Sequence, residues 1–176
     1  YLGTIPFAKL ARHAFIAKTL LDSLVFEKLL TGNQVDMFLN NLETVATEFT
    51  NDTRLLGQQK LSEEEFFERY GHLRPGTYDI LSRRYDQRGK DILQQRKKKI
   101  GRKNNTIQGK LSFFDKEQEH LINECLKLSN INCQFTDIIK YCETAIKGRE
   151  LAKFVFTKNV SDCLEIITLW GEKNGL

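Results

Sequence analysis

The chain has little of several features that mark particular classes of protein. Its 176 residues include only two prolines and 11 glycines, which argues against an all-β fold with its many tight turns. No apolar run is long enough to cross a membrane. The first residues lack the basic and apolar regions of a signal peptide. These absences favour a helical protein that does not enter a membrane.

The four cysteines lack the spacing of a metal or redox motif. They are Cys125, Cys133, Cys142 and Cys163, and no two of them stand in a C-x-x-C arrangement. The three histidines are far apart, so we expect no metal site. All four cysteines lie in apolar, helix-like sequence. We therefore expect free, buried thiols in a reducing compartment and a cytoplasmic protein.

The net charge of +4 comes from one segment. Ten basic and two acidic residues lie between Arg83 and Lys103, whereas the rest of the chain is net negative. Residues 86–110 have little apolar content and no periodicity, which predicts a mobile basic linker. The run from Arg96 to Lys103 fits a solvated loop, or binding to nucleic acid or an acidic surface. Nucleic acid is the less favoured reading, because no aromatic residues alternate with the basic ones.

Apolar residues recur at helical spacing over most of the remaining chain, and strand signals are absent. Glycine or capping residues set the expected ends. Gly32 is expected to end the first helix and Asn33 to cap the second. Ser62 with Glu65 forms a capping box, and Asp115 caps a later helix. The expected helices cover residues 5–30, 33–57, 62–70, 115–128 and 135–158, and a last one begins at Ser161.

This pattern predicts an all-α bundle of about six helices. Leu164, Ile167 and Trp170 are expected to be buried. We expect one helical domain over residues 1–176, with the basic linker between two helical halves. The chain has no initiator Met and stops abruptly, so we expect it to be a piece of a larger multidomain protein.

The most distinctive segment runs from Tyr70 to Tyr85. A Pro-Gly pair there predicts a turn between helices, where binding residues tend to lie. Arginine forks suit phosphate or carboxylate, and histidine can donate, accept or carry charge. The alternative is a structural turn whose charges pair with one another or with helix ends. The candidate binding or orienting residues are His72, Arg74, Asp79 and Arg84, and the turn residues are Gly71, Pro75 and Gly76.

Arg149 is a further candidate anion ligand. It stands on the apolar stripe of the helix expected at 135–158, and a buried charge needs a partner. Glu150 lies on the neighbouring face and is not expected to turn back to it. The partner would be a carboxylate from another helix, as in a structural buried pair, or a bound anion.

Catalytic motifs are missing from the sequence. It contains no G-x-S-x-G, no glycine-rich phosphate loop and no H-E-x-x-H. We assign no catalytic residue and do not expect this chain to be a complete enzyme.

Three stretches resemble phosphoenolpyruvate synthase-like proteins, which are related to pyruvate phosphate dikinase and rifampicin phosphotransferases. The first is the turn itself, and the others are Ala11 to Val25 and Gly148 to Ile167, in matching order. One position departs, because Arg83 stands where the family usually has proline. The turn residues that match the family pattern are Phe66, Arg69, Tyr70, Gly71, His72, Pro75, Gly76, Tyr78, Asp79, Ile80, Arg84 and Tyr85.

The resemblance implies the helical middle domain of such a phosphotransferase, which binds the acceptor or serves as a scaffold. An ATP-grasp domain that binds ATP and Mg²⁺ and a swivelling phosphohistidine domain would be its partners in the full-length protein. Phosphate would pass from ATP or phosphoenolpyruvate to a small-molecule acceptor such as pyruvate. The chain itself would hold no cofactor. The alternatives are a purely structural interaction module without a ligand site, and nucleic-acid binding by the basic segment.

Overall fold

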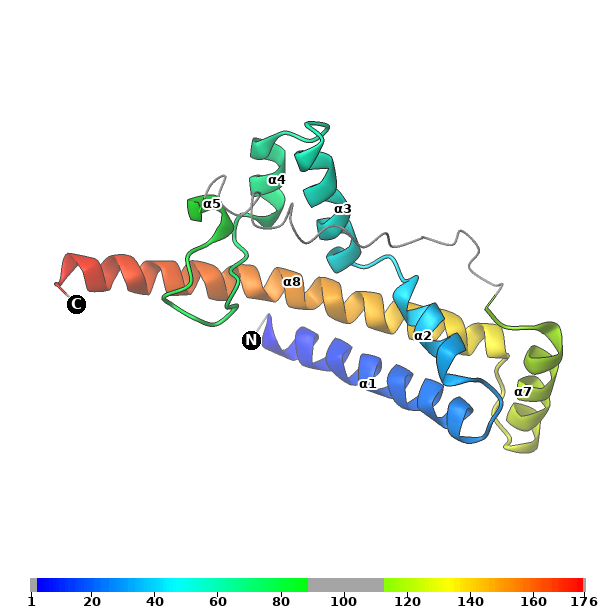
Figure 1. The fold of residues 1–176 in the computed structure, drawn as a ribbon. Helices are drawn as coiled ribbons and strands as arrows, with labels where there is room; N and C mark the ends of the chain where they lie inside the picture. The colour runs from blue at the N-terminus through cyan, green and yellow to red at the C-terminus, as the bar shows by residue number, and fades with distance from the viewer. Residues whose placement is uncertain (1–2, 89–112, 176) are drawn as a thin grey trace. The chain divides into compact units, whose positions relative to one another are not determined.

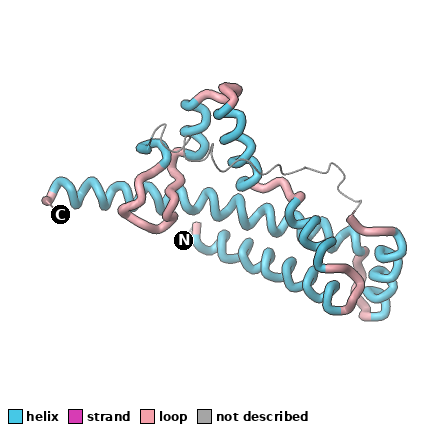
Figure 2. Tube along the Cα trace, in the orientation of Figure 1, coloured by secondary structure: helices cyan, strands magenta, loops and turns pink. Residues whose placement is uncertain are grey.

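The computed structural model describes residues 3–88 and 113–175, and every regular element in these ranges is an α-helix (Figure 2). The all-α prediction is therefore confirmed. Most of the expected basic linker, including Arg96 to Lys103, lies outside the described residues. No helix in the described ranges is long and apolar enough to span a membrane. The helices, labelled in Figure 1, are α1 (Thr4–Phe26), α2 (Gly32–Asn40), α3 (Val45–Gly57), α4 (Glu63–Tyr70), α5 (Tyr85–Arg88), α7 (Lys116–Leu128) and α8 (Phe135–Lys173).

Local hydrogen bonds define most helix starts. The predicted capping box of Ser62 and Glu65 is present at α4, and Asp115 caps α7 as expected. The prediction for α2 is wrong, because Thr31 is the N-cap and Gly32 is already the first helical residue. The Thr31 hydroxyl accepts a hydrogen bond from a backbone N–H one turn into the helix, which satisfies a donor that would otherwise be unpaired.

Three helices end on a non-glycine residue in the left-handed region. These residues are Lys28 after α1, Gln59 after α3 and Asn130 after α7, with φ of 59°, 58° and 56°. At each end the next backbone N–H donates to a carbonyl oxygen five residues earlier, the longer bond of a Schellman motif. This motif ends α1 at Phe26, so the helix is shorter than the sequence predicts.

Two predicted helix boundaries are wrong. The helix expected at 33–57 is broken into α2 and α3, because the Thr44 N–H donates to Thr47 Oγ1 at 2.7 Å and begins a new helix. Conversely, the helices expected on either side of Ser161 are one continuous helix, α8. Ser161 does not act as a cap, because its hydroxyl accepts a hydrogen bond from Arg74 instead.

The chain divides into two compact units that interleave along the sequence. Unit 1 comprises residues 1–43 and 105–152, and unit 2 comprises residues 44–104 and 153–176. The long helix α8 therefore begins in unit 1 and ends in unit 2. The expectation of one domain stays a prediction.

Unit 1 has the larger apolar core. Its helix α1 runs antiparallel to the first part of α8, as Leu10 near Gly148 and Ala17 near Cys142 show. The buried residues of this core are Ala17, Leu21, Leu30, Val35, Phe38, Leu42, Phe113, Ile122, Leu126, Phe135, Ile139, Cys142 and Ala145. Burial raises the pKa of the Cys142 thiol to about 11, so this cysteine packs as a small apolar side chain.

The cysteines are all free, but only one of them is buried. Cys142 is in the core, Cys133 is half-buried, and Cys125 and Cys163 are exposed. The prediction of four buried thiols is therefore wrong for the two exposed residues. Both lie in helices, on a side of the helix that does not face a core.

Unit 2 has a small aromatic core between α3, α4 and the second part of α8. Phe66 is 1% exposed and Tyr70 is 3% exposed, and both rings pack against Phe49 at centroid distances of 5.8 and 4.9 Å. Phe154 of α8 packs against Tyr70 at 5.9 Å. The Tyr85 ring stacks on Phe49 at 6.0 Å.

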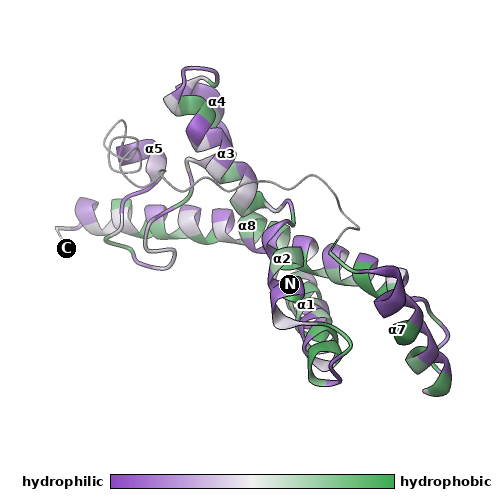
Figure 3. Ribbon diagram, turned by 45° about the vertical axis from the view of Figure 1, so that its right-hand side comes forward, coloured by the Kyte–Doolittle hydropathy of each residue, from purple (hydrophilic) through white to green (hydrophobic). Residues whose placement is uncertain are grey.

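The end of α8 differs from its prediction. Ile167 and Trp170 are 53% and 60% exposed, where the sequence pattern predicts burial, and Leu164 is half-buried. The face of this part of α8 that packs in unit 2 carries Thr157 and Ser161, which are small and polar. Ile167 and Trp170 follow Ser161 by six and nine residues, which at 100° per residue turns them about 120° and 180° away from it around the helix. Figure 3 shows hydrophilic and hydrophobic segments alternating along this part of α8.

Candidate functional site

The turn that joins α4 to α5 belongs to unit 2 and begins at Gly71. Any side chain at this position would force neighbouring atoms to move. A Cβ at Gly71 would lie 2.4 Å from the Phe67 carbonyl oxygen and 3.0 Å from Asp86 Cβ. The Gly71 carbonyl accepts a hydrogen bond from the Asp86 N–H, and the Leu73 carbonyl accepts one from the Tyr85 N–H. The two ends of the turn are thus tied together over Gly71.

The tip of the turn is shaped by its own polar groups. The Asp79 carboxylate accepts from the Leu81 N–H at 2.9 Å, and the Ser82 hydroxyl accepts from the Gly76 N–H at 3.1 Å. Gly76 also lies close to Asp79, since a Cβ there would be 3.0 Å from Asp79 Cβ. Pro75 and Asp79 are exposed. Asp79 therefore caps the backbone of the turn, as aspartate commonly does.

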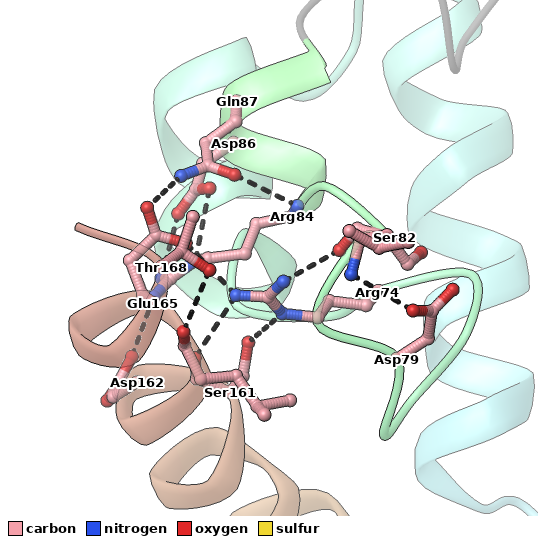
Figure 4. Close-up of polar contacts among 12 residues, drawn as sticks. Arg74, Asp79, Ser82, Arg84, Asp86, Gln87, Ser161, Asp162, Glu165 and Thr168 are labelled. Carbon is pink, nitrogen blue, oxygen red and sulfur yellow. Dashed lines mark hydrogen bonds and ion pairs between the residues drawn. The ribbon is translucent and has the colours of Figure 1, made fainter. Parts of the chain in front are cut away.

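Arg74 is the most deeply buried charge of the candidate set, with 2% of its side chain exposed. Its guanidinium donates four hydrogen bonds (Figure 4). Nε and Nη2 donate to the Ser161 hydroxyl and carbonyl at 3.0 and 3.2 Å, and Nη1 donates to the Ser82 carbonyl at 2.7 Å. Nη2 also pairs with Glu165 Oε2 at 3.0 Å. We call these contacts the Arg74 clasp, because they join the tip of the turn to α8.

Arg84 makes a second connection between the same segments. Its Nε and Nη2 form a two-pronged pair with Asp86 at 3.2 and 2.9 Å, and its Nη1 pairs with Asp162 Oδ1 at 2.7 Å. Burial alone would lower the pKa of Arg84, but the hydrogen bonds and charges of the two carboxylates outweigh this and raise it. The guanidinium is therefore charged, and three of its five N–H groups donate to carboxylates.

His72 lies behind the turn, 4% exposed, with its ring edge-on to Phe154 at a centroid distance of 4.8 Å. One side of the ring has a hydrogen bond to the Phe154 backbone, and Nε2 has no hydrogen-bond partner among the described residues. Burial lowers the pKa of His72, and the nearby charges of Lys158 and Arg84 lower it further. A neutral imidazole fits this site better than a charged one.

Arg149 belongs to unit 1, unlike the other four candidates. Two expectations for it are wrong. Its side chain is 40% exposed, and Nη1 pairs with Glu150 Oε1 at 3.6 Å. The guanidinium also lies over the Phe15 ring, 5.7 Å from its centroid. A long side chain at the edge of an apolar stripe can place its charged end in water, so no buried partner is required.

The structure brings together His72, Arg74, Asp79 and Arg84 in one turn, but their partners on α8 were missed by the sequence analysis. The missed residues are Ser161, Asp162 and Glu165 on α8 and Ser82 and Asp86 beside the turn. A signal for the first three existed. Ser161 and Glu165 are four residues apart and share a helix face with Asp162 beside them, a pattern that the sequence analysis interpreted as a helix start.

A tyrosine–carboxylate contact also supports this part of unit 2. The Tyr70 hydroxyl donates to Asp52 Oδ2 at 2.9 Å, and Arg69 Nη1 pairs with the same oxygen at 3.1 Å. Burial and this hydrogen bond raise the pKa of Tyr70 to about 12. Tyr70 therefore stays a hydroxyl that ties α4 to α3, rather than a source of protons.

The guanidinium groups of Arg74 and Arg84 bind other residues of the chain, which leaves few donors for a ligand. Four of the five Arg74 N–H groups are used, and Arg84 has three bonds to carboxylates. The described residues contain no group of three or more His, Cys, Asp or Glu side chains that could hold a metal ion. What the turn can do is fix its exposed tip rigidly against the helix.

Comparison with known proteins identifies no relative of this chain. A scan against protein-family models, a search of curated proteins and a search of solved structures each found no match to this chain. Arguments about function therefore depend on the turn and the Arg74 clasp.

Proposed function

We propose that this chain is the helical middle domain of a phosphoenolpyruvate synthase-like phosphotransferase, and that it acts as a scaffold. In the full-length cytoplasmic protein, a neighbouring ATP-grasp domain would bind ATP and Mg²⁺. A swivelling domain would carry phosphate on a histidine toward a small-molecule acceptor. The helical domain would hold these partners in position and perform no chemical step itself.

The observation that carries the scaffold role is the Arg74 clasp. The residues that resemble the family signature are the ones that shape the turn and join it to α8, as Gly71, Arg74 and Arg84 do. An arginine that binds a phosphate or carboxylate ligand needs free donors. Here the carboxylates of Asp86, Asp162 and Glu165 already occupy those donors.

The same observation weighs against direct acceptor binding. A phosphate or pyruvate carboxylate would have to displace Glu165 from Arg74, which is buried, or the two carboxylates from Arg84. Separating a buried charge from its partner costs about 3–5 kcal/mol, which would reduce ligand affinity strongly. A rigid turn with an exposed tip fits a docking role better.

Calorimetric titration of the chain with phosphate, pyruvate and phosphoenolpyruvate tests the absence of an anion site. We expect no binding heat with any of the three. Binding that is lost in Arg84→Met but kept in Arg83→Met would instead show an acceptor site on the turn and contradict the scaffold role.

The family assignment needs the longer polypeptide that we expect to contain this chain. We expect that protein to transfer phosphate from ATP to an acceptor. In Arg74→Met, kcat should fall while the KM values for ATP and acceptor stay unchanged, and Arg83→Met serves as the exposed control. A longer polypeptide that neither binds ATP nor forms a phosphohistidine would refute the assignment.

A further inference from the structure

The end of α8 carries the only asparagine of the chain that is followed by glycine. Asn174 and Gly175 come directly after the last helical residue, Lys173. Both are exposed, and a Cβ at Gly175 would meet no atom within 4 Å apart from its chain neighbours. Water therefore reaches the Asn174 side chain and the backbone that follows it.

Asparagine is one of the thermolabile residues, and before glycine it can react with its own backbone. The glycine nitrogen loses its proton and attacks the asparagine Cγ, a C–N bond forms, and the side-chain amide leaves as ammonia. Water then opens the succinimide ring at either of its two carbonyl groups, which yields aspartate or isoaspartate. Glycine favours the attack because it has no Cβ beside the attacking nitrogen. Every other asparagine of the chain precedes a larger residue.

The last turn of α8 holds this pair in a conformation that does not react. The Asn174 side chain donates from Nδ2 to the Trp170 carbonyl at 2.7 Å, and its backbone N–H donates to the Gly171 carbonyl at 2.9 Å. The Gly175 N–H donates to the Glu172 carbonyl at 3.3 Å, so the attacking nitrogen points back along the helix. These hydrogen bonds must open before the Gly175 nitrogen can turn toward the Asn174 side chain.

The hydrogen bonds at this helix end open easily. The side-chain bond of Asn174 is exposed to water, where a hydrogen bond adds little net stability, and the Gly175 bond is longer than usual. Gly175 has a φ of 73°, in the left-handed region that ends a helix. The final turn of a helix also opens more readily than its interior. The folded chain therefore reaches the reactive conformation by local opening.

We propose that Asn174–Gly175 is a site of spontaneous covalent modification, at which Asn174 becomes aspartate or isoaspartate at a rate set by the last turn of α8. Water is the only co-reactant, and ammonia is the product released. This inference goes beyond the scaffold role and does not depend on it.

The modification destabilises the end of α8. The product carboxylate cannot donate to the Trp170 carbonyl, as the Asn174 amide does. It also places a negative charge at a helix C-terminus, where the unpaired carbonyl groups already disfavour one, and Glu172 is nearby in the sequence. Isoaspartate adds one carbon to the backbone, which disrupts regular helical hydrogen bonding there.

Peptide mapping by mass spectrometry, after incubation of the chain in mildly alkaline buffer, tests the site. Asn130 is the internal control, because it is exposed at the end of α7 but is followed by isoleucine. We expect Asn174 to deamidate more than about tenfold faster, since a β-branched neighbour crowds the attacking nitrogen. Equal rates at the two residues, or no reaction at Asn174, would overturn the proposal.

The products and a glycine variant test the chemical step. Ring opening should give isoaspartate together with aspartate, whereas direct hydrolysis of the amide would give aspartate alone and contradict the ring. Gly175→Ala should slow the reaction about tenfold, because its Cβ stands beside the attacking nitrogen. The same slowing is expected in a peptide of residues 166–176. Slowing in the chain alone would contradict the assigned nucleophile.

The unmodified peptide also tests the role of α8. It is too short to hold a stable helix in water, so its Asn174 should react about tenfold faster than in the chain. Equal rates would show that the helix end does not control the reaction.

Asn174→Asp, a stand-in for the aspartate product, tests the structural consequence. It should speed backbone hydrogen exchange in the last turn of α8 about threefold and leave exchange in α1 unchanged. Unchanged exchange in that turn would contradict the expected loss of helix at this end.

Discussion

Units 1 and 2 are stabilised by different kinds of contact. Unit 1 buries one continuous cluster of 13 apolar residues from α1, α2, α7 and α8, the segments on either side of α2 and the segment before α7. In unit 2 the corresponding buried cluster has three members, Leu56, Phe66 and Tyr70. Among the described residues, unit 2 adds two buried or half-buried arginines with carboxylate partners, in the Arg74 clasp and the pairs of Arg84.

This difference predicts which kind of substitution destabilises each unit most. Apolar burial is nondirectional and tolerates small adjustments, whereas a buried guanidinium requires particular partners at particular distances. Unit 2 should therefore respond most to changes of single polar atoms, and unit 1 to changes of side-chain volume. Because the units need not unfold together, backbone hydrogen exchange resolved along the chain is the appropriate measurement.

The largest effect should come from Arg74→Ala. Removal of the guanidinium leaves Glu165 Oε2 and the Ser82 carbonyl without their arginine donor, while Gln87 still donates to Glu165 Oε1. Breaking a buried pair of this kind costs about 3–5 kcal/mol. We expect faster hydrogen exchange in the turn and in α4, with exchange in α1 unchanged. Arg83→Ala, which removes an exposed arginine from the same turn, should change neither. Equal protection in both variants would show that the clasp is not what stabilises unit 2.

A slightly smaller effect is expected from Leu21→Ala in unit 1. Leu21 is fully buried, and truncation of such a leucine costs about 2–5 kcal/mol, depending on how far the cavity collapses. Exchange should accelerate in α1, α2 and α7 while the turn in unit 2 keeps its protection. Phe26→Ala removes a larger side chain from the same helix, but that side chain is 82% exposed, so little should change. Loss of protection in both units would mean that they unfold as one.

A stabilising change of about 1 kcal/mol is expected when glycine replaces a residue in the left-handed region. Lys28→Gly should stabilise unit 1 and Gln59→Gly should stabilise unit 2, since each removes the strain of a side chain at positive φ. Asn130→Gly should gain less, because asparagine tolerates this conformation better. Thermal unfolding of the three variants measures the order, and a larger gain for Asn130→Gly would contradict it.

The smallest effect should be a loss of stability in unit 2 under mild acid. Burial, with the charges of Lys158 and Arg84, lowers the pKa of His72 below 6.5, so the folded chain binds this proton more weakly than the unfolded chain does. The stabilisation is complete above pH 6.5 and falls as the pH drops from 6.5 toward the folded pKa. The loss of protection from hydrogen exchange as the pH falls should therefore be seen in the turn and not in α1.

Two histidine variants separate this effect from general acid sensitivity. His72→Phe, which cannot titrate, should flatten the pH dependence of unit 2. His120→Gln should leave it unchanged, because the His120 side chain is 75% exposed and lies in unit 1. A pH dependence that survives His72→Phe would assign the proton to another group.

The fold was predictable where the controlling contact is local. The capping box of Ser62 and Glu65 spans three residues and was recognised, and so was the cap at Asp115. The end of α1 was missed, because Lys28 adopts a conformation that its residue type disfavours. The continuity of α8 through Ser161 was also missed, since a serine within a helix looks like a cap until its partner is known.

The candidate site was predictable in its members but not in its contacts. The residue types pointed to Gly71, His72, Arg74, Asp79 and Arg84 as one turn, and the structure places them there. The sequence could not show that Arg74 and Arg84 bind residues of α8. These contacts favour a structural clasp over an anion site. For Arg149, the apolar stripe suggested burial, but a long side chain at its edge reaches Glu150 and the Phe15 ring instead.

By itself, the sequence determined the all-α class, the helix starts with local caps and the position of the polar turn, because periodicity and capping act over three or four residues. The tertiary structure alone decided that Arg74 is occupied, since its partner Ser161 lies 87 residues away in the sequence. It also decided that the apolar residues at the end of α8 face outward. A pattern along one helix shows which face is apolar, and only packing shows whether another element of the chain covers that face.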